Sequence, residues 1–414
     1  MVGAARCASY DPVGVRTSVA QALARAGDPL ATVRRGDRVL VKLNHLGEHP
    51  PERAVITHPE VLGAALEQLV DHGARVVVGD VLDRPGSEAF RTSGTWDACA
   101  RVGVEPVNLR EWGYARVNSP GATRVPRPLL SRAVSECDLV MNLPKLKAHV
   151  QVTLTLGLKN TYGLLPFRVR TQYHRQFLAV RDFAEMLVDI YSAVAPRFTL
   201  MDGIVALEGA GPGRKGVPRE VGVLLAGQDP VALDAVATNL VGLTPRRIDT
   251  TRIAADRGMG EARLDRVQLV GGTLDELRIP DFRLPRPMLF AATLMDRMPP
   301  VVVEPATRLA SWSREVPAHT GAGCTSCGGC AARCPEQAIT MVEGTPVVAL
   351  ERCQPCFACV EGCPSGALTA TWNGPGQLTH RLTRLANRTR RRLKRWLGLR
   401  PTRSLRQGGG SCSP

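Results

Sequence analysis

The hydrophobic pattern divides the chain into a long first part and a short second part. From residue 4 to 272, short runs of Val, Leu and Ile alternate with segments whose apolar residues recur at helical spacing. The predicted strands are residues 38–44, 74–80, 104–109, 138–143, 198–203, 221–227 and 266–270. Because most of these runs are apolar without alternation, we expect an α/β domain with a mostly parallel sheet and helices on both faces.

Four helices are predicted between these strands, at residues 15–26, 59–72, 176–194 and 230–241. The last one opens with Asp229 and Pro230, an N-cap residue followed by proline at the first helical position. Residues 281–320 are rich in proline and have no strand pattern, so we expect a connecting segment with a helix near 289–297. The predicted domains are therefore 1–280 (α/β), 281–320 (connecting segment), 321–372 (small α+β domain) and 373–414 (basic tail, partly disordered).

Two cysteine runs with identical spacing follow the connecting segment. Each reads C-x2-C-x2-C-x3-C-P, the spacing of bacterial two-cluster ferredoxins, in which the fourth cysteine ligates the other cluster. One predicted 4Fe-4S cluster is held by Cys324, Cys327, Cys330 and Cys363. The second is held by Cys353, Cys356, Cys359 and Cys334. Residues 321–372 are thus predicted to form a dicluster ferredoxin-like domain.

Zinc and disulfides are the alternatives for these cysteines. A structural zinc site uses four ligands in C-x2-C pairs and does not require a doubled run that ends in proline. A disulfide framework is typical of secreted chains, and residues 1–10 lack a charged and then apolar secretory pattern. Two 4Fe-4S clusters remain the cofactors that the spacing indicates.

Polar residues stand at the carboxyl ends of several predicted strands. They are Asn44, Asp80, Asn142, Asp202 and Asp229. In open α/β sheets, ligands bind in the crevice outside these strand ends. Asn and Asp also cap helices and form turns, which is the alternative for each residue taken singly. Together the five predict a shared cleft.

The use of lysine points to the same region. The chain has six lysines among many arginines, and four of them lie in strand-end segments: Lys42, Lys145, Lys147 and Lys159. A compact ammonium suits an anionic ligand, while solvated surface lysines are the alternative. Asp80, Asp202 and His149 are candidates for proton delivery. Lys42, Asn44, Asn142 and Asn160 are further candidates for binding, and the glycine-rich loop 208–216 could close over an anion.

Several longer motifs carry a family resemblance. The segments 57–60, 142–149, 157–164, 201–213 and 229–237 resemble the domain of unknown function 362 family over about residues 4–272. Members of that family often carry the same ferredoxin module behind this domain. The resemblance implies an iron-sulfur protein of redox type and does not specify a reaction. The arginine-rich tail is a departure from the family pattern.

The net charge of +15 comes mainly from the tail, because residues 375–414 contain eleven Lys or Arg and no Asp or Glu. Apolar residues at helical spacing among these arginines suggest peripheral contact of residues 378–400 with an anionic membrane, or a solvated helix packed on the body. Nucleic acid is disfavoured because the tail has one aromatic residue and no reading motif. No apolar run is long enough to cross a bilayer, so we expect a cytoplasmic protein.

Three functions fit these features. The first is a ferredoxin-dependent oxidoreductase that passes electrons from the clusters to a small anionic substrate in the α/β cleft. The second is a non-enzymatic electron-transfer or assembly protein whose α/β domain docks a redox partner. The third is a cluster-based sensor that binds nucleic acid or membrane through its tail.

Overall fold

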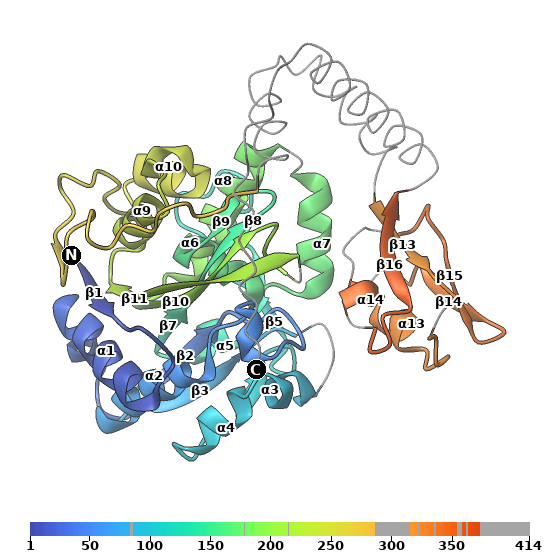
Figure 1. Cartoon of the computed structure of the whole chain (residues 1–414), viewed down its shortest axis with the longest axis horizontal. Coiled ribbons are helices and arrows are strands. Elements are labelled where there is room, and N and C mark those ends of the chain that lie inside the picture. The colour runs from blue at the N-terminus through green and yellow to red at the C-terminus, as the bar shows by residue number, and fades with distance from the viewer. Residues whose placement is uncertain are drawn as a thin grey trace, which may run out of the picture.

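The computed structural model describes residues 1–82, 86–177, 179–213, 215–285, 315–321, 323–334, 337–353, 358–361 and 363–372. The residues up to 285 form an α/β domain around a mixed sheet of ten strands, and the described residues between 315 and 372 form a separate small domain (Figure 1). The predicted helix at 289–297 and the tail from 373 to 414 lie outside the described residues.

The centre of the large sheet is parallel. Its order is β12-β1-β11-β10-β7-β2-β3-β4, with β8 paired to β10 and β9 paired to β8. The strands are β1 (Val2–Arg6), β2 (Arg38–Leu43), β3 (Arg75–Asp80), β4 (Pro106–Asn108), β7 (Leu139–Leu143), β8 (Lys145–His149), β9 (Thr153–Thr155), β10 (Phe198–Gly209), β11 (Gly216–Gly227) and β12 (Leu269–Val270). Within the described residues of this sheet, the β1–β11, β10–β11 and β8–β9 pairs are antiparallel and the other strand pairs are parallel. The mostly parallel sheet is confirmed.

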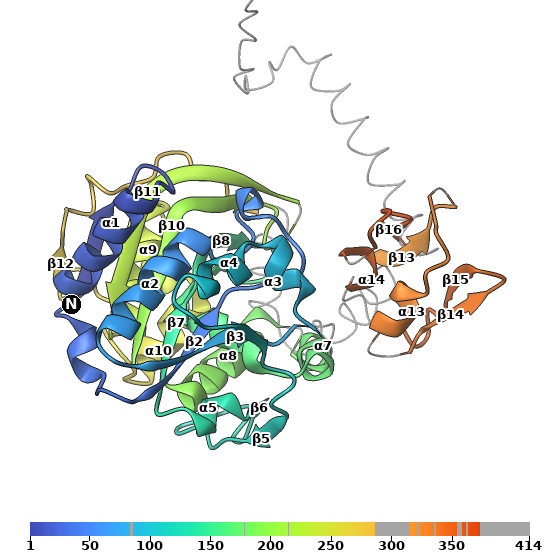
Figure 2. The ribbon, with the colours of Figure 1, turned by 90° about the horizontal axis from the view of Figure 1, so that it is seen from below.

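Helices cover both faces of this sheet (Figure 2). On one face, α1 (Pro12–Arg25) and α2 (Pro59–Asp71) pack against Val39 and Val41 of β2. On the other, α8 (Val180–Val194) packs against Leu40 of the same strand, while α9 (Pro230–Leu240) covers β1, β10 and β11. Alternate residues of one apolar strand therefore enter two different cores, as the uninterrupted apolar runs predicted.

The shorter elements of the α/β domain lie mostly in the connections. They are α3 (Glu88–Thr92), α4 (Thr95–Ala100), β5 (Tyr114–Arg116), β6 (Leu129–Ser131), α5 (Ala133–Glu136), α6 (Gly157–Asn160), α7 (Phe167–Gln176), α10 (Asp249–Asp256) and the 3-10 turns Pro29–Thr32, Pro51–Arg53, Thr161–Leu164 and Pro245–Arg247. The helix predicted at 176–194 is in fact preceded by the separate helix α7, and α8 begins at Val180. Asp229 caps α9, since its side chain accepts the amides of Val231 and Ala232.

The small domain consists of two antiparallel strand pairs and two short helices. Its elements are β13 (Glu315–His319), α13 (Gly329–Arg333), β14 (Ile339–Val342), β15 (Thr345–Val348), α14 (Ala358–Glu361) and β16 (Leu368–Trp372). β13 pairs with β16, and β14 pairs with β15. Since β13 lies within 281–320, the expectation that this segment contains no strand is wrong. The strand EVPAH was missed because it is short, contains a proline and pairs with residues some fifty positions later in the chain.

Candidate functional site

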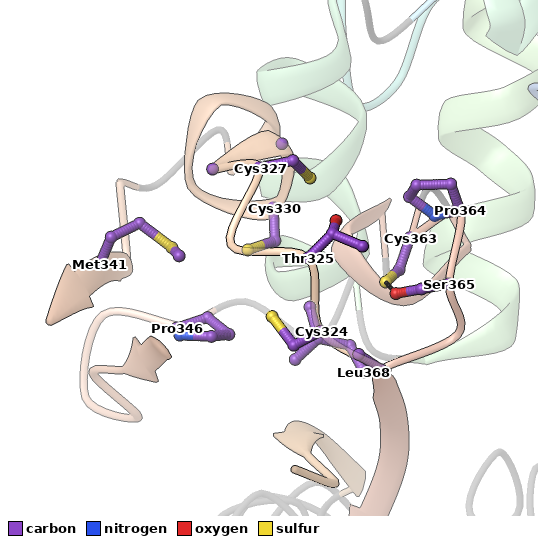
Figure 3. A pocket seen from close by; sticks show the side chains of 13 residues that line it. Cys324, Thr325, Cys327, Cys330, Met341, Pro346, Cys363, Pro364, Ser365 and Leu368 are labelled. Atoms are coloured by element: carbon purple, nitrogen blue, oxygen red, sulfur yellow. Dashed lines mark hydrogen bonds between the residues drawn. The ribbon is translucent and has the colours of Figure 1, made fainter. Parts of the chain in front are cut away.

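Cysteines from both runs line one cavity in the small domain, which we call the cysteine cavity. Cys324, Cys327 and Cys330 come from the first run and Cys363 from the second, around a space of about 370 Å³ (Figure 3). This is the set predicted for one 4Fe-4S cluster. β13 precedes the first cysteine run and β16 follows the second. The pairing of these two strands therefore brings the two runs close together.

A tight turn sets the spacing within the first run. Gly328 has φ +67°, a left-handed conformation that glycine adopts without strain, and α13 starts at the next residue. Cys327 therefore lies just before the turn and Cys330 just after it. A hydrogen bond from the Gly329 amide lowers the pKa of the Cys327 thiol, which favours the thiolate that iron binds.

The second predicted set is described in part. Cys353 and Cys359 are buried, and Cys334 and Cys359 belong to the apolar cluster around Ile339 and Leu368. Cys356 lies outside the described residues. The Cys334 sulfur accepts a hydrogen bond from the Ala338 amide at 3.2 Å, the kind of contact that tunes a cluster's potential.

The donor geometry suits a cluster better than a single ion. Within the described ranges, no three His, Cys, Asp or Glu side chains converge closely enough to hold one metal ion. A zinc site needs its sulfurs about 2.3 Å from one point. Here the four thiols surround a cavity, which fits a polynuclear cluster.

A second site lies in the α/β domain, at the carboxyl ends of β2 and β3. We call it the lysine cleft, after Lys42, Lys147 and Lys159. Its empty space is about 440 Å³, part of which is continuous with solvent. Six predicted residues line it: Lys42, Asn44, Asp80, Lys147, Lys159 and Asn160. Seven further residues line it: His45, Leu46, Thr155, Tyr162, Gly163, Arg170 and Pro212, of which Pro212 belongs to the glycine-rich loop 208–216.

An ion pair forms part of the cleft wall. Lys42 is fully buried, and its Nζ donates to Asp80 Oδ2 at 2.7 Å and to the carbonyl of Leu43. Burial lowers the pKa of Lys42, and Asp80 partly offsets this. Asp80 also accepts the amides of His45 and Val81. This carboxylate is thus fully engaged, which makes it a poor candidate for proton delivery.

A chain of amides holds the second lysine. Lys147 Nζ donates to Asn44 Oδ1 at 2.5 Å and to the Val55 carbonyl at 2.8 Å. Asn44 donates to Asn160, and Asn160 donates to Asn142, each at 2.8 Å. The ammonium is therefore positioned by neutral oxygens. Burial, and next the charge of Lys159, lower the pKa of Lys147 well below its usual value.

Several polar groups in the cleft have no partner among the described residues. Lys159 Nζ lies 5.5 Å from the centre of the Tyr162 ring, and burial lowers its pKa to about 8. His45 Nδ1, Thr155 Oγ1 and Arg170 Nε are buried and accept or donate no hydrogen bond within the described ranges. Buried polar atoms are normally paired. Three unpaired buried atoms on residues that line one cleft point to a ligand.

Lys145 and Asp202 form a separate buried network. Lys145 Nζ donates to Asp202 Oδ2 at 2.7 Å and to the Tyr10 hydroxyl at 2.6 Å. Tyr10 donates to Asp202 Oδ1 and stacks on the ring of His58. Neither Lys145 nor Asp202 lines the cleft, so the expectation that all four strand-end lysines meet there fails for Lys145. Its amine is directed toward the β10 carboxylate instead.

Two other predicted residues also lie away from the cleft lining. His149 Nδ1 accepts the amide of Gln151 at 3.1 Å, and burial lowers the pKa of this imidazole well below its usual value. Asn142 accepts a hydrogen bond from Asn160, which lines the cleft. No spacing in the sequence identified His45, Thr155 or Arg170. The only signal was that His45 directly follows the strand-end residue Asn44.

The cysteine cavity and the α/β domain define the class of protein, an iron-sulfur protein with a ferredoxin-type domain. Residues 317–364 match the model of the 4Fe-4S dicluster domain, and residues 39–239 match that of the domain of unknown function DUF362. Thylakoid-associated protein sll1697 of Synechocystis sp. is 36% identical over 265 residues, which are 62% of this chain and 78% of that protein. The chain belongs to the DUF362 family.

Among solved structures, the lactate racemase apoprotein from Thermoanaerobacterium thermosaccharolyticum gives a match. It matches with a TM-score of 0.36 and 14% identity over 54% of this chain and 53% of that chain. The chain thus spans about half the length of the racemase. Among the helices of the described ranges, none has the length and apolar character required to traverse a bilayer.

Proposed function

We propose that this protein binds two 4Fe-4S clusters and acts as a ferredoxin-dependent reductase of a small anionic substrate. Cys324, Cys327, Cys330 and Cys363 would hold one cluster, and Cys353, Cys356, Cys359 and Cys334 the other. The substrate would bind in the lysine cleft. The observation that carries the second part is the set of unpaired buried atoms on His45, Thr155 and Arg170 in a cleft with excess positive charge.

The charges of the cleft favour an anion. Lys42 has a carboxylate partner in Asp80, but no carboxylate is paired with Lys147, Lys159 or Arg170 among the described residues. A bound anion would therefore neutralise charge that the protein leaves uncompensated. Lys159 and Arg170 would bind the anionic group, and Lys147 would be held in place behind it by Asn44.

The chemistry needs electrons and protons together. When bound, the clusters would supply one electron each to the substrate. A redox partner protein would then reduce the clusters again. A substrate that accepts two electrons also takes up two protons. These would come from solvent, to which the cleft is open, because the carboxylate of Asp80 is engaged by Lys42 and by the His45 amide. Lys145, Asp202 and His149 have no direct role in this scheme, because they do not line the cleft.

Anaerobic stopped-flow measurements test the reductase. The dithionite-reduced protein is mixed with a panel of small carboxylates and inorganic oxyanions, and cluster absorbance reports reoxidation. We expect one class of compound to reoxidise the clusters, and Lys159→Met and Arg170→Met to slow this by tenfold or more. Arg16→Ala, a surface change, is the control. Equal rates in all variants would exclude the cleft as the electron acceptor, and no reoxidation by any compound would favour the electron-carrier alternative.

We also propose peripheral contact with anionic membranes through residues 378–400. This proposal is supported by the arginine-rich amphipathic sequence and by the name of the relative, a thylakoid-associated protein. Full-length protein should sediment with vesicles that contain anionic lipid and not with neutral vesicles. A variant that lacks residues 377–414 should remain in the supernatant. Equal sedimentation of both forms would refute the role of the tail.

A further inference from the structure

Some polar atoms of the lysine cleft without hydrogen-bond partners in the described part of the chain are donors and one is an acceptor. They would therefore bind different groups of a ligand. Arg170 Nε can only donate, and the ammonium of Lys159 can only donate. The Thr155 hydroxyl can do either. These groups match the oxygens of one anionic group. Arg170 Nη2 already donates to the Val81 carbonyl at 2.9 Å, which positions the guanidinium, and Nε–H is a buried donor of this group without a partner among the described residues.

His45 would bind a hydrogen-bond donor of the ligand. Its Nε2 lies 3.0 Å from Ser93 Oγ, and the Ser93 hydroxyl is also within reach of the Phe90 carbonyl and Thr95 Oγ1. The carbonyl of Phe90 and Thr95 Oγ1 can each take the single hydrogen of Ser93, and in either arrangement Ser93 Oγ accepts from Nε2–H of His45. Nδ1 of the neutral ring is then a hydrogen-bond acceptor. Burial, with Lys42 nearby, lowers the pKa of His45 to about 3, which keeps the ring neutral.

We infer that the ligand of the lysine cleft is a small hydroxycarboxylate, whose carboxylate contacts Lys159, Arg170 and Thr155 and whose hydroxyl donates to His45 Nδ1. This deepens the proposed function and rests on the same cleft. A hydroxyl fits better than an amino group, because a protonated amine would be repelled by the uncompensated lysines. A carboxylate without a hydroxyl would leave His45 Nδ1 unpaired, which costs binding free energy.

Calorimetry on the oxidised, cluster-loaded protein tests this inference with matched pairs of compounds. Glycolate is compared with acetate, malate with succinate, and inorganic phosphate serves as the anion without a carbon chain. We expect the hydroxylated member of a pair to bind about tenfold more tightly, as one additional hydrogen bond to a buried group allows. Binding does not require electron transfer, so the result is independent of the reoxidation test.

Variants at His45 identify the group that reads the hydroxyl. His45→Leu should abolish the difference within each pair and leave the affinity for acetate and succinate nearly unchanged. His45→Gln, which keeps a polar acceptor, should retain part of the difference, and Lys159→Met should weaken both members equally. The inference is overturned by equal affinities within the pairs, by a hydroxyl preference that survives His45→Leu, by tighter binding of phosphate, or by no binding of any probe. In each of these cases the reductase proposal can still succeed with another class of anion.

Discussion

The two buried lysines of the cleft wall have different kinds of partner. Lys42 donates to the carboxylate of Asp80, whereas Lys147 donates only to the neutral oxygens of Asn44 and Val55. A buried ammonium without a counterion is costly, so its proton is held weakly until an anion arrives. A bound anion should therefore raise the pKa of Lys147.

Gly163 is required by the space beside the ion pair. A methyl group at this position would lie 2.9 Å from both Asp80 Oδ1 and Lys42 Nζ, closer than real contacts allow. We expect Gly163→Ala to lower the free energy of unfolding by about 1–3 kcal/mol, measured by urea denaturation.

The control for this change is Gly14→Ala in α1. The nearest atom to the added methyl there is Asp11 Oδ2 at 3.3 Å. Alanine in a helix should leave stability unchanged or raise it by up to about 1 kcal/mol. A Gly163→Ala protein as stable as the Gly14→Ala protein would mean that the Lys42–Asp80 pair moves aside at little cost.

Ligand affinity should depend on pH through Lys159. Burial lowers the pKa of its ammonium to about 8, so the charged form that binds an anion predominates below that pH and is lost above it. The affinity for an anion should be nearly constant up to pH 7 and fall by as much as tenfold per pH unit beyond pH 8. Titrations from pH 6 to 10 measure this. Lys159→Met should bind weakly without the step near pH 8, and a wild-type affinity unchanged from pH 7 to 9 would contradict the assignment.

The sequence predicted these residues unevenly. Lys42, Asn44, Asp80, Lys147, Lys159 and Asn160 were found because they follow apolar strands, and strand ends meet at one edge of a sheet. His45, Thr155 and Arg170 were missed because what distinguishes them is an unpaired atom, which exists only once the neighbours are in place. Lys145 has the same sequence signature as Lys147, but the two ammonium groups have different partners: Lys145 lies opposite Asp202 of β10, whereas Lys147 donates to Asn44 and Val55.

Among the elements, β8 is tied to its neighbours by charge. Lys145 lies opposite Asp202 of β10 in the parallel pair, and Tyr10 before α1 hydrogen-bonds to both side chains. The backbone amides of His58 and Ile204 also donate to Asp202. One carboxylate therefore joins β8, β10, the start of α1 and the start of α2.

Removing this carboxylate charge should destabilise the whole domain. Asp202→Asn leaves the Lys145 ammonium buried and uncompensated, so we expect a loss of about 3–5 kcal/mol in the free energy of unfolding. Glu67→Gln, which breaks the exposed Arg16–Glu67 pair, is the control and should cost less than about 1 kcal/mol. Similar small losses in both variants, measured by chemical denaturation, would show that the network contributes little.

The elements that the sequence predicted best are the apolar strands of the parallel centre. β8 was missed although Lys145, Lys147 and His149 alternate with Leu146 and Ala148, the pattern of a half-buried strand, and all five residues are in fact buried. β10 and β11 extend beyond the predicted strands into the glycine-rich loop, where Gly209 and Gly216 pair across a hairpin. Polar side chains that find partners in the interior cannot be recognised from hydrophobicity alone.

At the scale of the molecule, each cluster is expected to depend on both cysteine runs. Cys363 lies with Cys324, Cys327 and Cys330 although it is far from them in sequence. Loss of either Cys324 or Cys363 should therefore affect the same cluster.

Iron and acid-labile sulfide content measures this dependence. Cys324→Ser and Cys363→Ser should each lose about half of the iron, and the double variant should lose no more than either single one. Cys324→Ser combined with Cys353→Ser should lose nearly all of it. Additive losses for Cys324 and Cys363 would contradict the crossed assignment of the ligands.

The pairing of β13 with β16 has a mechanical consequence. Glu315 lies opposite Trp372, so the chain enters and leaves the small domain at one point. Tension between the α/β domain and an anchored tail would pull on this end of the strand pair and bypass the cysteine cavity. Because its two ends are adjacent, the segment 315–372 could be inserted into a surface loop of another protein without separating the ends of that loop.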